Sequence, residues 1–417
     1  MAQISTSTAE NGLPVHRIAI PGTRATTILV AFDAGARSEQ AEENGMAHFL
    51  EHLVFKGGQI YDDYRKVNET AERMGGSLNA YTSHDIVAFH ITVRAESAMP
   101  AIDLLTDFVG RPRIDPEELD RERGVVIQEI QRYKDQPASV AGELIDVAGF
   151  GDHPLGRSVL GPEEHLESFT RDQVVAFRER RWSGRTGGAF IVGNLDHLDA
   201  NGEVNEAFAR FPDLPAPGSF EQVPEFSPEI LVEERDSNQS HLRMLYRPEI
   251  DVSDPAERAA FGIYATLLGG SMGSRLFDEI REQRGLAYSV FALNHFSSDH
   301  GLLLLGAGLE SKKTDEAYRR MMEIVAELAS DGPTEEEVER ARAYAGGRRV
   351  LSFEDTNSVA SFAAGRAIVH GEGFDPDEAI ALIDAVSHED VARVARLVDP
   401  EQLAVACVGP HEASEFA

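Results

Sequence analysis

Residues 45–57 read Gly45-Met46-Ala47-His48-Phe49-Leu50-Glu51-His52-Leu53-Val54-Phe55-Lys56-Gly57. The apolar run and the two glycines that follow it predict a helix from about Met46 to Phe55. On such a helix, positions i, i+3 and i+4 share one face, so His48, Glu51 and His52 point the same way. Two imidazoles one turn apart can hold a divalent ion, and the acid beside them can reach a water on that ion. The alternative is a polar helix face with two solvated histidines.

A third ligand would distinguish a metal site from a solvated surface. Residues 115–118 are typical of a helix start, with an aspartate as N-cap and a proline at the first helical position, and this helix is expected to reach Tyr133. It carries Glu122 and Glu129, which lie two turns apart and therefore share a face. Three apolar residues are expected to anchor it in the core: Val125, Val126 and Ile130. Acidic helix faces also occur without a metal, so the glutamates alone leave both alternatives open.

The length of the chain, 417 residues, predicts two domains. Residues 212–228 contain five prolines and one glycine in a polar, acidic stretch, which is typical of a linker. We therefore expect an N-terminal domain at 1–212 that carries the metal site, a linker at 213–228 and a C-terminal domain at 229–417.

The second half of the chain repeats the order of elements in the first half. A strand and a helix that ends at Gly269-Gly270 follow one another there, as a strand and the helix that ends at Gly57-Gly58 do in the first half. Matching the two glycine pairs gives an offset of 212 residues and places Ala260, Ile263 and Tyr264 at the positions of the histidine motif. The second domain is therefore expected to share the fold without the metal ligands.

Charge and composition exclude several classes of partner. The formal net charge is −32, and such a surface repels phosphate backbones, so we expect no nucleic acid partner. Cys407 is the only cysteine, which rules out an intrachain disulfide and a thiolate metal cluster, and its apolar surroundings at 403–408 predict a buried thiol. No apolar run reaches the roughly 20 residues that span a bilayer, and residues 1–17 lack the pattern of a secretory signal. We expect no membrane partner and a cytoplasmic location.

Two of these stretches resemble the M16 metallopeptidases, a family that includes pitrilysin, insulin-degrading enzyme and the mitochondrial processing peptidases. Residues 45–57 are similar to the family's zinc helix, and Glu122-Arg123-Gly124-Val125-Val126-Ile127-Gln128-Glu129-Ile130 is similar to its third-ligand helix. The resemblance extends over nearly the whole chain. It implies one zinc ion per chain, held by His48, His52 and Glu129, with the fourth position left for water.

The same resemblance implies roles for the acids beside the ligands. Glu51 is then the general base, which takes the proton of the attacking water and passes it to the leaving amine. Glu122 is a second acid near the site that supports a ligand. An iron oxygenase with two histidines and one carboxylate is an alternative for this ligand set, but the position of Glu51 between the ligands favours hydrolysis.

Two further stretches resemble the substrate-binding parts of the family. Residues 75–82 are similar to a strand to which an extended substrate adds as another strand, which implies that Asn79 and Ala80 contact the substrate backbone. A helix and strand of the second half are similar to a motif that meets the substrate opposite the zinc. This implies that Arg281 holds a substrate carbonyl and that Tyr288 donates to the developing oxyanion. Without the resemblance, residues 75–82 would be read as an ordinary hairpin strand. Arg281 would then lie at an ordinary helix end, and Tyr288 would be a packed tyrosine.

The expected fold is α+β, with two related domains that each contain a mostly antiparallel sheet packed by helices and that together form half of a clamshell. The expected function is zinc-dependent hydrolysis of internal bonds in unfolded peptides inside a closed chamber. Longer relatives carry four such domains in one chain, so this chain is expected to form a homodimer with a shared active site. The alternative is a non-catalytic partner or core subunit of a larger complex, which would typically lack a ligand, the base, or Arg281 and Tyr288.

Overall fold

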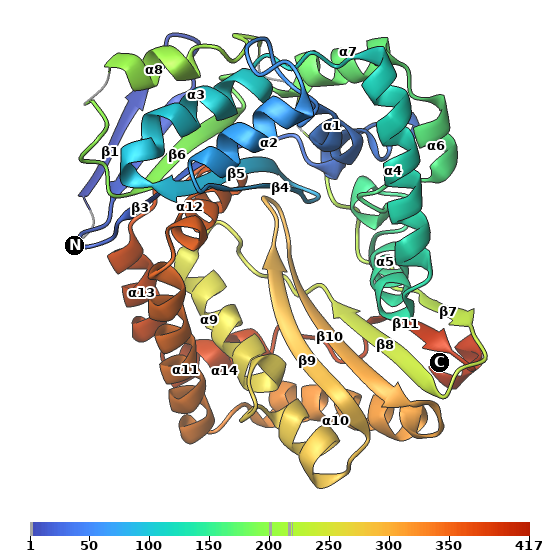
Figure 1. The fold of residues 1–417 in the computed structure, drawn as a ribbon. Coiled ribbons are helices and arrows are strands. Elements are labelled where there is room, and N and C mark those ends of the chain that lie inside the picture. Colours follow the sequence, from blue (N-terminus) through green and yellow to red (C-terminus); the bar gives the residue numbers. More distant parts are fainter. Residues whose placement is uncertain (1–2, 200–201, 216–217, 219) are drawn as a thin grey trace. The chain divides into compact units, whose positions relative to one another are not determined.

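The computed structural model describes residues 3–199, 202–215, 218 and 220–417. They form two compact units, each built around one sheet (Figure 1). The first unit comprises residues up to 130, 158–220 and 351–378, and the second comprises residues 131–157, 221–350 and 379–417. Both units are therefore assembled from separate stretches of the chain.

The sheet of the first unit has six strands in the order β1-β2-β6-β3-β5-β4. The strands are β1 (Gln3–Thr8), β2 (Pro14–Ala19), β3 (Ala25–Phe32), β4 (Ser77–Thr82), β5 (Val87–Arg94) and β6 (Gly187–Gly193). Neighbouring strands are antiparallel, except that β2 and β6 are parallel. β3 is buried along nearly its whole length, whereas β4 is an edge strand with half-buried and exposed residues.

Helices cover both faces of this sheet. They are α1 (Met46–Val54), α2 (Tyr64–Arg73), α3 (Ala98–Phe108), α6 (Glu163–Ser168), α7 (Arg171–Arg181), α8 (Gly202–Phe208), α12 (Thr356–Ala364) and most of α4 (Pro116–Lys134). Thr27 of β3 hydrogen-bonds Thr356 of α12. Phe89, which pairs with Val30 of β3, contacts Phe55 at the end of α1. Because side chains alternate along a strand, α1 and α12 lie on opposite faces.

The second unit repeats the topology of the first with five strands in the order β7-β11-β8-β10-β9. The strands are β7 (Ile230–Glu234), β8 (Gln239–Tyr246), β9 (Ala287–Phe296), β10 (Gly301–Glu310) and β11 (Ala404–Gly409). β7 and β11 are parallel, and the other neighbours are antiparallel. The first unit has the same pattern: β2 and β6 are parallel, and the neighbours in the order β6-β3-β5-β4 are antiparallel. The chain visits these five positions in the same order in both units, so the predicted repeat is confirmed at the level of topology.

The helix that corresponds to α1 in the second unit is α9 (Pro255–Ala265), which continues into a π-helical turn. Ala260, Ile263 and Tyr264 lie on it, and all three are buried in the core of the unit. The remaining helices of the unit are α5 (Pro137–Phe150), α10 (Thr314–Asp331), α14 (His388–Ala395) and parts of α11 (Glu335–Phe353) and α13 (Pro376–Ala385). In the second unit, the residues that correspond to the histidine motif are therefore part of the apolar core.

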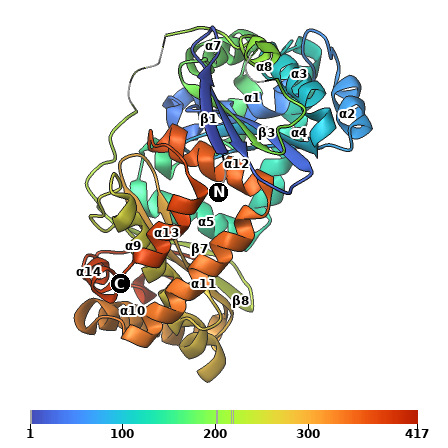
Figure 2. The ribbon, with the colours of Figure 1, turned by 90° about the vertical axis from the view of Figure 1, so that its left-hand side faces the viewer.

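Each half of the chain contributes one helix to the other sheet. α5 comes from the first half but packs on β8 and β11, and α12 comes from the second half but packs on β3 and β6. Figure 2 shows α12 next to β3. The compact units therefore differ from the contiguous domains expected at 1–212 and 229–417. Hydrophobic periodicity locates a helix along the chain but does not say which sheet the helix covers, so this exchange could not be predicted.

Other local expectations can be compared with the structure directly. Cys407 is buried in β11 as predicted. Val126 and Ile130 are buried, but Val125 is 49% exposed, so its predicted place in the core is wrong. Val125 precedes Val126 by one residue, so its side chain lies to the side of the apolar stripe of α4 and faces solvent. Across the described part of the chain, no helix combines the length and the apolar character needed to cross a membrane.

Candidate metal centre

The N-terminus of α1 is held by a glycine and a buried carboxylate. Gly45 has a φ of 98°, and a Cβ there would lie 2.7 Å from the carbonyl oxygen of Leu160, so this position requires glycine. The carboxylate of Glu39, which is 4% exposed, accepts hydrogen bonds from the backbone N–H groups of Gly45 and Ala47 at 3.0 and 2.7 Å. Glu39 thus provides the acceptor that a glycine N-cap lacks. It was not identified from the sequence.

His48, His52 and Glu129 converge on one point. The Nε2 atoms of His48 and His52 lie 3.9 and 3.5 Å from Oε2 of Glu129. One ligand atom from each of the three lies within 4.8 Å of the others, and the described residues contain no second such group. Ligands bound tetrahedrally at about 2.1 Å lie about 3.4 Å apart, so the separations fit a single zinc ion.

The two imidazoles differ in their protonation. Burial and the neighbouring His52 lower the pKa of His48 to about 3, so this ring is neutral and its lone pair is available to a metal. Burial also lowers the pKa of His52, but the hydrogen bond and charge of Glu122 and the nearby carboxylates raise it above its usual value. The surroundings of His52 therefore stabilise a positive charge, which a metal ion can supply in place of a proton.

Glu122 supports His52 from the side opposite the ligand cluster. Its Oε1 lies 3.0 Å from Nδ1 of His52, and its Oε2 lies 2.5 Å from Nζ of Lys56. Burial raises the pKa of Glu122, but these two partners lower it below its usual value. A carboxylate that holds Nδ1–H leaves Nε2 free for a metal, which is the contact that the expected role of Glu122 requires. Lys56 was missed, although it follows His52 by one helical turn.

Glu51 lies on the same face of α1 and accepts a hydrogen bond from the hydroxyl of Thr82 at 2.6 Å. Burial raises the pKa of Glu51 above its usual value, while Thr82 and His52 act in the opposite direction. A carboxylate with a raised pKa is a stronger base than an exposed one, which suits general base catalysis. Thr82 was also missed, although it closes the stretch 75–82 that resembles the substrate strand.

The two predicted substrate contacts on β4 lie at a sheet edge. β4 pairs with β5 on one side, and within the described residues its other side has no partner strand. The side chain of Asn79 accepts a hydrogen bond from the backbone N–H of Ala80 at 2.9 Å. Such an edge can take an extended peptide as a further strand, provided that the peptide displaces Asn79 from this N–H.

Arg281 and Tyr288 belong to the second unit. Arg281 lies in the π-helical turn Phe277–Gln283, and the chain turns at Gly285 with a φ of 59° before β9 begins. Tyr288 lies on β9, an edge strand, and is 86% exposed. It is therefore not a packed tyrosine, which removes the simpler explanation that the sequence left open.

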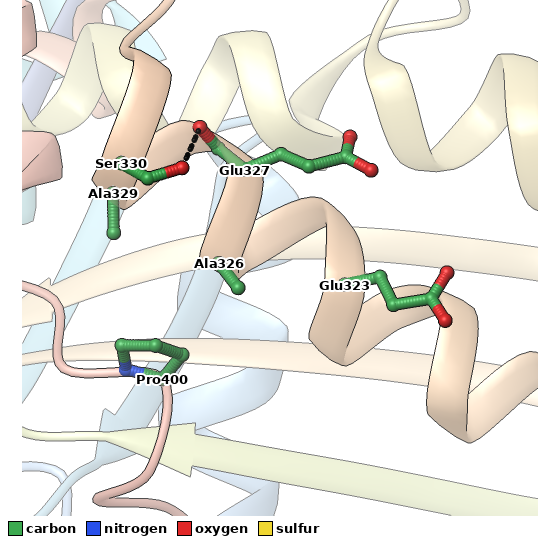
Figure 3. A pocket seen from close by; sticks show the side chains of 6 residues that line it. All are labelled: Glu323, Ala326, Glu327, Ala329, Ser330 and Pro400. Atoms are coloured by element: carbon green, nitrogen blue, oxygen red, sulfur yellow. Dashed lines mark hydrogen bonds between the residues drawn. The ribbon is translucent and has the colours of Figure 1, made fainter.

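A shallow depression of about 600 Å³ also lies on the second unit. Figure 3 shows the residues that line it: Glu323, Ala326, Glu327, Ala329, Ser330 and Pro400. Glu327 pairs with Arg320, and the side chains of Glu323 and Glu327 point away from Pro400. Polar groups do not converge in this depression, so it is not a candidate catalytic site.

Comparison with known proteins identifies the family. Residues 15–163 match the sequence profile described as insulinase (peptidase family M16), and residues 168–344 match the profile described as peptidase M16 inactive domain. The uncharacterized zinc protease YmxG of Bacillus subtilis is 31% identical over 403 residues, which cover 97% of each chain. An uncharacterized zinc protease of Mycobacterium leprae is 31% identical and covers 98% of this chain and 92% of its own.

A solved structure shows the same fold. The peptidase M16 inactive domain from Pseudomonas fluorescens superimposes with a TM-score of 0.90 at 20% identity and covers 98% of this chain and 99% of its own. At 20% identity this structural similarity shows the fold alone. The 31% identity to the zinc proteases over nearly the whole chain shows that they are homologues. The chain belongs to peptidase family M16, in its short two-domain form.

Proposed function

We propose that this chain is a zinc-dependent endopeptidase that hydrolyses internal bonds of unfolded peptides. The observation that carries the proposal is the convergence of His48, His52 and Glu129 on the helix face that also holds Glu51. The relatives named as zinc proteases support zinc rather than iron. When bound, zinc would supply an acidified water and polarise the scissile carbonyl.

The residues of the chain would carry the proton transfers and place the substrate. Glu51 accepts a proton from the attacking water and returns it to the leaving amine. A peptide lies along β4, where Asn79 and Ala80 meet its backbone, and only an unfolded segment can adopt this extended form. The exposure of Tyr288 supports a binding role for it, and Arg281 is proposed to hold a substrate carbonyl.

A closed chamber and a homodimer complete the proposal. In the described part of the chain, the first unit holds the single group that could bind a metal, and the second unit carries Arg281 and Tyr288. Two copies would supply the four domains that longer relatives hold in one chain. The alternative function is that of a non-catalytic partner or core subunit, as the name of the Pseudomonas structure suggests for that protein. The presence of the ligands, the base, Arg281 and Tyr288 in this chain argues against it.

The test uses a mixed peptide library, with products read by mass spectrometry. The zinc-loaded protein should cut at internal bonds, lose this activity after chelation and regain it with added zinc. Products from the ends of peptides only would contradict endopeptidase action. Zinc-loaded protein that cuts no peptide would favour the non-catalytic alternative. Rapid cleavage of a stable folded protein would contradict the restriction to unfolded chains.

A further inference from the structure

Thr82 connects the strand at the sheet edge with the helix that carries the base. It is the last residue of β4 and pairs with Val87 of β5. Its hydroxyl donates to Oε2 of Glu51 at 2.6 Å. Within the described residues this is the only hydrogen bond that the Glu51 carboxylate accepts.

The alternation of side chains along β4 explains why Thr82 makes this contact. Ser77 pairs with Thr92, which lies on the face of the sheet that α12 covers, and Tyr81 shares that face because it follows Ser77 by four residues. Thr82 therefore points to the opposite face, where α1 packs against β4. Ala80 shares this face, but it has no polar group. Thr82 is thus the residue of the edge strand that can reach the polar face of α1.

We propose that Thr82 is a positioning residue, whose hydroxyl holds the Glu51 carboxylate in its working orientation and ties it to the strand that binds peptide. The inference rests on the proposed function. Without the hydroxyl, Glu51 can rotate about its side-chain bonds, and the share of molecules with a correctly aimed base falls. The hydrogen bond of the Thr82 hydroxyl goes to Glu51 and not to a metal ligand, so zinc binding should not depend on it.

Two substitutions separate the hydroxyl from the shape of the side chain. Thr82→Val keeps the shape and removes the donor, and we expect kcat to fall about tenfold, as for one lost hydrogen bond, with KM and zinc content unchanged. Thr82→Ser keeps the donor and should retain kcat within about twofold. Thr6→Val is the matched control, because Thr6 is an exposed residue of β1, the other edge strand of the same sheet. It should leave kcat unchanged.

Two further measurements show whether Thr82 acts through Glu51. In a Glu51→Gln background, Thr82→Val should slow the residual reaction by less than about twofold. Crystal structures of zinc-loaded Thr82→Val and Thr82→Ser should show the Glu51 carboxylate displaced in the first and in place in the second.

The proposal is overturned if Thr82→Val keeps the wild-type kcat, if Thr82→Ser is as slow as Thr82→Val, or if the Glu51 carboxylate keeps its place without the hydroxyl. An equal loss from Thr82→Val in the wild-type and Glu51→Gln backgrounds would also overturn it. If the wild-type protein cuts no peptide, the proposed function fails, and the crystal structures still decide whether Thr82 positions Glu51.

Discussion

Among single residues, two hydrogen bonds from outside the ligand set hold one ligand and the base of the metal centre. Glu122 holds His52, and Lys56 holds Glu122, so the orientation of one ligand depends on a chain of two contacts. Thr82 holds Glu51. The ligands and the base stand out in the sequence because their spacing follows the helical repeat. Lys56 and Thr82 do not, because only the folded chain shows which polar side chain reaches which acid.

Removing the support of His52 should weaken metal binding without abolishing it. Glu122→Gln removes the charge that favours a cation at His52, so we expect zinc affinity to fall about 10- to 100-fold, the usual range for such partners. Competition with a chromophoric chelator measures this affinity. Glu117→Gln, on the exposed first turn of the same helix, is the control and should bind zinc as the wild type does. Unchanged affinity in Glu122→Gln would contradict the supporting role.

Asp146 on α5 should make stability fall as pH rises. Burial, with a further contribution from Glu143, raises its pKa to about 7. Between about pH 4 and pH 7 the folded state keeps a proton that the unfolded state has released, so the free energy of unfolding decreases with pH. Asp146→Asn should therefore be about 1 to 3 kcal/mol more stable than the wild type at pH 8 and similar to it at pH 4.

Urea denaturation at the two pH values measures the effect of Asp146→Asn. Asp236→Asn, at an exposed loop position, serves as the control and should change stability at neither pH. A stability difference for Asp146→Asn that is the same at pH 4 and pH 8 would mean that the proton on Asp146 is not its cause.

Among the helices and strands, the sequence predicts where each element lies along the chain but not on which of the two sheets a helix packs. The predicted helices at 46–55 and 115–133 agree with α1 and α4. The exchange of α5 and α12 between the sheets was missed, because both helices are amphipathic and either sheet offers an apolar face. Tertiary packing alone decides such a choice, and the same limit explains why Glu39 was not seen as the partner of α1.

Loss of the Glu39 carboxylate should loosen α1. Glu39→Ala leaves the backbone N–H groups of Gly45 and Ala47 buried without an acceptor, which should lower the free energy of unfolding by about 2 to 3 kcal/mol. Zinc affinity should fall as well, since α1 carries two ligands. Glu354→Ala, at an exposed position, is the control. Wild-type stability in Glu39→Ala, measured by urea denaturation, would show that the helix does not need this cap.

For the whole molecule, we expect a homodimer with a shared active site. A Glu51→Gln variant lacks the base, and an Arg281→Ala, Tyr288→Phe variant lacks the groups of the second unit. If each site combines the first unit of one subunit with the second unit of the other, a mixed dimer regains one complete site. Activity after subunit exchange should then rise well above that of either variant alone. No rescue despite demonstrated exchange, or a monomer in solution, would contradict the shared site.

We propose that His48, His52 and Glu129 form the zinc site of a peptidase in which Glu51 is the base. The most direct measurement is the rate of peptide hydrolysis by wild type and Glu51→Gln at equal zinc content. Glutamine keeps the size of the side chain but cannot take the proton, so we expect equal zinc binding and at least about 100-fold slower cleavage. Near-wild-type turnover by zinc-loaded Glu51→Gln would show that Glu51 is not the base.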